Sequence, residues 1–69
     1  MKTSARNVLS GKIISIVRGP VTTEVTLEIA SKVQIVSTIT STSAVTLKLT
    51  EGAKAYAVVK ASSVMVGVD

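Results

Sequence analysis

The chain is short, apolar and basic: it has 69 residues, 46% of them hydrophobic, and a formal net charge of +4 at pH 7. It contains no Cys and no His, which excludes disulfides, thiolate sites and the imidazole groups most used in acid–base catalysis and metal binding. The length predicts a single domain, residues 1–69, with a core too small to be very stable without association.

The first third of the chain reads as two strands. Residues 8–18 are rich in β-branched side chains, and Gly11 among them indicates a bulge or a close approach of another backbone. Gly19 and Pro20 form a turn signal, after which residues 21–29 alternate between apolar and polar side chains. The side chains expected to point inward are Val21, Thr23, Val25, Leu27 and Ile29.

The middle of the chain begins with a third strand at residues 33–39. Its inward side chains are Val33, Ile35 and Ile39. Residues 41–50 fit two structures, because apolar residues alternate there as in a strand and also recur at helical spacing. A hydroxyl at Ser41 or Thr42 suits a helix start and Gly52 suits a helix end, so we favour a short helix.

The last third of the chain reads as two more strands. Residues 53–60 place Ala55, Ala57 and Val59 inward, and residues 64–68 form a final short strand after a turn at residues 61–63. Three strands, a short helix and two strands are the order of an all-β, OB-like five-stranded barrel.

The hydrophobic content predicts a homo-oligomer, since so small a chain cannot hide all of its Val, Ile, Leu and Ala side chains. No apolar run approaches the ~20 residues of a membrane span, and no signal peptide is visible, so we expect a cytoplasmic protein without a membrane partner.

The sequence argues against an enzyme and against a cation site. Glu24 and Glu28 share the polar face of a strand and read as solvated carboxylates, and the four carboxylates of the chain are too dispersed to hold a hard cation. Ser62 beside Lys60 could form a Ser–Lys nucleophile, but nothing in the sequence supplies an oxyanion partner for it.

Anion binding fits better, because it requires hydroxyl and N–H donors beside one or two cations. Such donors gather in three short stretches, at residues 3–7, 40–44 and 60–62. The side chains suited to an anion are Ser4, Arg6, Asn7, Thr40, Ser43, Lys60 and Ser62. For each hydroxyl taken alone, a role in a turn or a helix cap is the plainer interpretation.

The order and spacing of these stretches resemble the Mop domain, a family of molybdate-binding domains. Residues 3–13, TSARNVLSGKI, are similar to its S-A-R-N opening followed by apolar residues and G-x-[IV]. Residues 39–47, ITSTSAVTL, are similar to T-x-x-S-A-x-x-L, and residues 49–64 are similar to L-x-x-G…V-x-A…K-A-S-x-V. The resemblance covers nearly the whole chain, and a free-standing Mop domain of this size is called a molbindin.

The resemblance implies a barrel that exchanges strands between subunits and assembles into a hexamer, a trimer of dimers. It implies molybdate or tungstate as the bound ligand at subunit interfaces, without an organic cofactor, in storage and homeostasis. The matching site residues are Ser4, Arg6, Thr40, Ser43, Ala44, Lys60 and Ala61, with Asn7 and Ser62 inside the same motifs. We expect residues 40–44 and 60–62 to reach the first stretch from another subunit.

Two other functions remain open from the residues themselves. A nucleic-acid-binding OB or cold-shock-like module is compatible with a basic barrel, but such surfaces stack bases on aromatic side chains, and Tyr56 is the only aromatic residue. A purely structural oligomerisation module would leave Arg6 and Lys60 beside hydroxyls without a role.

Overall fold

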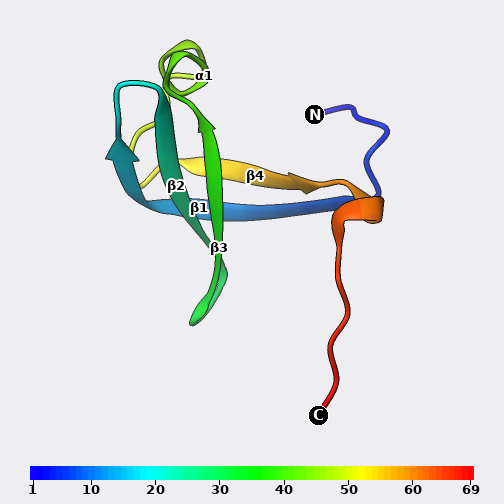
Figure 1. Cartoon of the computed structure of the whole chain (residues 1–69). Coiled ribbons are helices and arrows are strands. Elements are labelled where there is room, and N and C mark those ends of the chain that lie inside the picture. Colours follow the sequence, from blue (N-terminus) through cyan, green and yellow to red (C-terminus); the bar gives the residue numbers. More distant parts are fainter.

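The structure, a computed structural model, describes residues 1–69 and is built around one curled antiparallel sheet (Figure 1). Its strands are β1 (Asn7–Arg18), β2 (Thr22–Ala30), β3 (Val33–Thr40) and β4 (Lys54–Val59), in the spatial order β3-β2-β1-β4. Helix α1 (Ser41–Thr46) joins β3 to β4, and a 3-10 helix, η1 (Ala61–Ser63), follows β4. The first four expected strands and the short helix are therefore confirmed.

Strand β1 serves both halves of the sheet. From Asn7 to Lys12 it pairs with β4, and from Lys12 to Arg18 it pairs with β2. Its pairing with β2 shifts register between Ile13 and Ser15, so the irregularity lies beyond Gly11. Because a bulge bends a strand and increases its twist, this shift helps β1 to turn from one partner to the other.

Gly11 lies where the backbones of β1 and β2 approach closely, which is the second of the two roles that the sequence indicated for this glycine. A Cβ atom at this position would lie 2.7 Å from the backbone oxygen of Glu28 on β2. We expect Gly11→Ala to lower the free energy of unfolding by about 1–3 kcal/mol, since the two strands must separate to admit the methyl group. Chemical denaturation at matched protein concentration measures this. Ser10→Ala on the same strand is the control, and equal stability of the two variants would contradict the packing described here.

The core lies between β1 and β2, where Ile13, Val25 and Leu27 are buried. Six partly buried side chains pack against them: Ile16, Ile29, Ile39, Leu49, Ala55 and Ala57. The expected inward face of β2 is confirmed at Thr23, Val25 and Leu27, which alternate along the strand and are all buried.

Two residues predicted to point inward are instead exposed. Val21 precedes the first residue of β2 and is 72% exposed in the turn that follows β1. Val33 is 47% exposed, because it pairs with Ala30 at the tip of the β2–β3 hairpin, beyond the curled part of the sheet (Figure 1).

Helix α1 ends earlier than the position of Gly52 suggested. Lys48 adopts a left-handed conformation with a φ of 54°, and its N–H donates to the carbonyl of Val45. The N–H of Leu49 then donates to the carbonyl of Ala44, which completes a Schellman motif. Gly52, with a φ of 88°, belongs to the turn before β4 and not to the helix end.

The fifth strand predicted at residues 64–68 does not form within the single chain. After η1 the backbone leaves the sheet and runs away from it (red in Figure 1). No strand of the same chain lies beside it, and Met65, Val66 and Val68 are each at least 90% exposed. One chain thus provides four strands and an extended apolar arm, which we define as residues 64–68.

Candidate functional site

The first and third polar stretches meet at one end of the sheet. Asn7 begins β1 and pairs with Val59, the last residue of β4, so the residues before Asn7 and after Val59 lie side by side. Together they form an open hollow of about 590 Å³, which we call the basic hollow. Its lining residues are Thr3, Ser4, Ala5, Arg6, Val58, Lys60, Ala61 and Ser62.

The basic hollow has the donor chemistry of an anion site. It contains two cations, Arg6 and Lys60, and no carboxylate among its lining residues. The hydroxyl groups of Ser4 and Ser62 add neutral donors, and the planar guanidinium can donate two parallel hydrogen bonds to one oxyanion. Asn7 does not line the hollow but is half-buried beside it at the start of β1.

The middle stretch lies at the start of α1. Thr40 caps the helix, since its Oγ1 accepts a hydrogen bond from the N–H of Ser43 at 3.1 Å. The same hydroxyl donates to Ser43 Oγ at 2.7 Å. The hydrogen of the Ser43 hydroxyl is therefore not used by Thr40 and can be donated to a further acceptor. Ala44 is 1% exposed, so its methyl group packs on the buried side of the helix.

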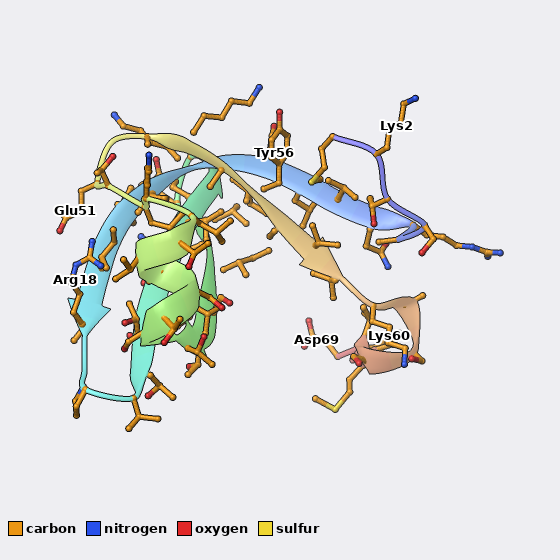
Figure 2. All side chains as sticks on the ribbon, turned by 90° about the horizontal axis from the view of Figure 1, so that it is seen from above. Lys2, Arg18, Glu51, Tyr56, Lys60 and Asp69 are labelled. Carbon is orange, nitrogen blue, oxygen red and sulfur yellow. The ribbon has the colours of Figure 1, made fainter.

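The basic hollow and the start of α1 lie at opposite ends of the folded molecule. Strand β1 runs from the basic hollow at Asn7 toward α1 at Arg18, and its 12 residues span roughly 35–40 Å along the strand. Figure 2 shows Lys60 at one end of the molecule, and Arg18 beside α1 at the other. One chain cannot bring Thr40 and Ser43 to its own basic hollow.

Residues 60–62 are placed differently from the sequence expectation. We expected them to reach residues 3–7 from another subunit, but the pairing of β1 with β4 brings them together within one chain. Of the other lining residues, Thr3 and Ala5 fall inside the predicted stretch 3–7 but were not among the candidate ligands, and Val58 lies outside the three stretches. Thr3 has a local role, because its Oγ1 accepts a hydrogen bond from the N–H of Ala5 at 3.2 Å. In the sequence, the position of Thr3 next to Ser4 was the feature that could have identified it as a lining residue.

A second hollow, of about 620 Å³, opens on the inner face of the sheet, and we call it the apolar hollow. Fourteen of its 16 lining residues are hydrophobic, including the core residues Ile13, Val25 and Leu27. Only 5 of 69 residues are buried, so a single chain covers its own core incompletely.

No helix of the structure is long and apolar enough to cross a membrane.

Comparison with known families settles the family. The TOBE domain matches residues 3–66, which is nearly the whole chain. The chain belongs to the TOBE domain family. The resemblance to Mop domains, drawn above from the three polar stretches, is confirmed by this match and by the relatives described next.

Two curated proteins resemble this TOBE domain along its whole length. The "Probable molybdenum-pterin-binding protein" of Haemophilus influenzae is 45% identical over 69 residues, which cover 100% of both chains. The "Molybdenum transport protein ModE" of Herbaspirillum seropedicae is 51% identical over 69 residues. The chain spans 26% of the length of that ModE, so it corresponds to one part of the larger protein.

A solved structure confirms the fold. The cytoplasmic molybdate-binding protein ModG, in a form with molybdate bound, matches 100% of this chain with a TM-score of 0.93 and 42% identity. The match covers 49% of the ModG chain. The mostly β, curled, OB-like architecture with one short helix is thus shared with a protein of known structure.

Proposed function

We propose that this TOBE domain binds molybdate or tungstate reversibly, in storage and homeostasis of the oxyanion. The observation that carries the proposal is the basic hollow, in which Arg6 and Lys60 lie among hydroxyl donors without a carboxylate. Support comes from ModG, a 42% identical protein whose structure contains molybdate and which is described as cytoplasmic. We place this domain in the cytoplasm as well.

The donor set suits a tetrahedral dianion that must be released again. Each hydrogen bond to a charged group contributes about 1.5–3 kcal/mol net. Micromolar affinity corresponds to about −8 kcal/mol, so several such bonds are needed to reach it after the cost of association. The proposed ligands are Ser4, Arg6, Asn7, Lys60, Ser62 and the backbone N–H of Ala61 from one chain and Ser43 from another. Thr40, whose hydroxyl hydrogen is already donated to Ser43, and Ala44, which is buried, are proposed to hold the start of α1 and not to contact the anion.

The second chain enters because Thr40 and Ser43 lie at the far end of their own chain. In a two-fold pair, the α1 end of each chain meets the basic hollow of the other. Such a pair has two equivalent sites, and a separated chain holds only half of each.

Assembly is proposed to proceed by strand exchange. The arm, residues 64–68, is extended and apolar, and the partner offers free sheet edges at β3 and β4 as well as the apolar hollow. Addition of the arm to a partner completes a five-stranded barrel and covers exposed hydrophobic surface in both chains. The hexamer, a trimer of such dimers, is the assembly that the Mop resemblance implies.

Neither a nucleic-acid module nor an enzyme is favoured. Base stacking needs free aromatic faces, yet the ammonium of Lys54 lies 5.3 Å from the ring centroid of Tyr56, the only aromatic residue. For catalysis, the chain offers no His or Cys, and no group of three or more acidic side chains comes together. We therefore propose binding without chemical change of the anion.

Calorimetric titration tests the proposal with three sodium salts. Molybdate or tungstate is expected to bind with a dissociation constant of about 1 μM or below, as several charged hydrogen bonds allow. Sulfate should bind at least ~10-fold more weakly, since a smaller anion reaches fewer donors in a site shaped for a larger one. Absence of both binding heat and thermal stabilisation with molybdate and with tungstate would contradict the proposed function.

A further inference from the structure

Thr23 is the only buried polar side chain of the structure, with 1% of its surface exposed. It belongs to β2, whereas its hydrogen-bond partner Ser41 is the first residue of α1. Thr23 Oγ1 lies 2.8 Å from Ser41 Oγ, and Ser41 Oγ lies 2.6 Å from the carbonyl oxygen of Gly19. A hydroxyl chain thus connects the beginning of β2 to the turn after β1 through the start of the helix.

The direction of these hydrogen bonds follows from the atoms involved. The carbonyl of Gly19 can only accept, so the single hydroxyl hydrogen of Ser41 is donated to it. Ser41 Oγ must then accept from Thr23, which makes Thr23 the donor that satisfies Ser41. Neither hydroxyl keeps a hydrogen that it could donate to an anion, so their role is to hold other groups in place.

The hydroxyl chain fixes the first turn of α1. The backbone N–H of Ser41 also donates to the carbonyl of Val21 at 2.8 Å, so three hydrogen bonds anchor this one residue. A six-residue helix is not stable alone in water and depends on such contacts for its position. Ser41 lies between Thr40, which caps the helix, and the helical turn that contains Ser43.

We propose that Thr23 and Ser41 are positioning residues, which hold α1 so that the Ser43 hydroxyl is presented to the anion bound by a partner chain. This inference rests on the proposed function for its ligand. It assigns a role in binding to Thr23, a residue outside the proposed ligand set. The hydroxyl of Thr23, and not only its volume, is required.

The first test uses the protein without ligand and three variants of β2. Thr23→Val keeps the shape of the side chain and removes the donor, Thr23→Ser keeps the donor, and Thr26→Val makes the same chemical change where no side-chain hydrogen bond is lost. Hydrogen exchange at the amides of Ser43 and Leu47, both hydrogen-bonded in α1, is expected to speed up about threefold to tenfold in Thr23→Val alone. Unchanged exchange in Thr23→Val overturns the inference whether or not the protein binds molybdate.

The second test measures molybdate affinity in a double-mutant cycle with Ser43→Ala. Thr23→Val is expected to lower affinity about threefold to tenfold in the parent and less than about twofold in the Ser43→Ala background, because it acts through Ser43. Equal losses in both backgrounds, or a loss that Thr23→Ser shares, overturn the positioning role. If the parent binds no molybdate while exchange still responds to Thr23→Val, the anion function fails and the anchoring of α1 by Thr23 stands.

Discussion

Replacing Arg6 by Gln is expected to weaken molybdate binding by about 10- to 100-fold, the equivalent of one charged hydrogen-bond donor or a bidentate pair. Arg6 is exposed just before β1 and lines the basic hollow with Lys60. None of the side-chain hydrogen bonds of the chain involves it. The substitution therefore removes the proposed ligand contacts without removing a side-chain hydrogen bond that the fold uses.

Calorimetry of Arg6→Gln is compared with Lys32→Gln, which also removes one positive charge. Lys32 lies in the turn between β2 and β3, outside the basic hollow. We expect near-parent affinity for Lys32→Gln and an unchanged subunit number for both variants. If the two substitutions weaken binding equally, net charge and not the basic hollow attracts the anion, and Arg6 is removed from the site.

Placing a charge on the arm is expected to dissociate the assembly. In an extended strand Val64, Val66 and Val68 share one face, whereas Met65 lies on the other. If that valine face docks on a partner, Val66→Glu buries an unpaired carboxylate at a cost of several kcal/mol. Light scattering after size exclusion should then report smaller species, and molybdate affinity should fall with them because the two halves of each site no longer meet.

Met65→Glu is the matched control for the arm, since it adds the same charge to an adjacent, equally exposed residue. We expect it to retain the parent assembly and affinity. Dissociation by both substitutions would show only that the arm tolerates no charge. An assembled Val66→Glu protein with parent affinity would exclude docking of the valine face.

The sequence predicted the strands well where one face alone is buried. Alternation along residues 21–29 identified Thr23, Val25 and Leu27, because a side-chain period of two leaves a strand only one way to bury its apolar set. It failed at Val21 and Val33, whose apolar character fits the pattern but which lie at strand ends beyond the core. Local pattern does not reveal where a sheet stops curling.

The other misses concern a backbone conformation and a segment that has no strand to pair with in its own chain. The early end of α1 depends on the left-handed conformation of Lys48. A lysine rarely adopts this conformation, so the residue type at this position did not predict it. The arm has strand-forming residues but no strand to pair with in its own chain. Its alternation could therefore predict its conformation but not its partner.

The candidate site was predictable in composition and only partly in arrangement. The motifs named Arg6, Lys60 and Ser43, yet only the register that pairs Asn7 with Val59 places Lys60 beside Arg6 and leaves Ser43 at the other end. The proposed anchoring of α1 by Thr23 was not predictable, because a threonine at an inward position of an alternating strand is indistinguishable from an ordinary core residue. Its hydrogen bond to Ser41 joins two elements distant in the sequence.

Native mass spectrometry with and without molybdate tests most directly the claim that assembled chains form the anion site. The 7.1 kDa chain is expected to appear as a hexamer, or at least as an even-numbered multimer, that gains molybdate, while any monomer in the same sample gains none. A parallel sample with sulfate should show little or no bound anion. A monomer that binds molybdate, or a complete assembly that binds none, would contradict the account.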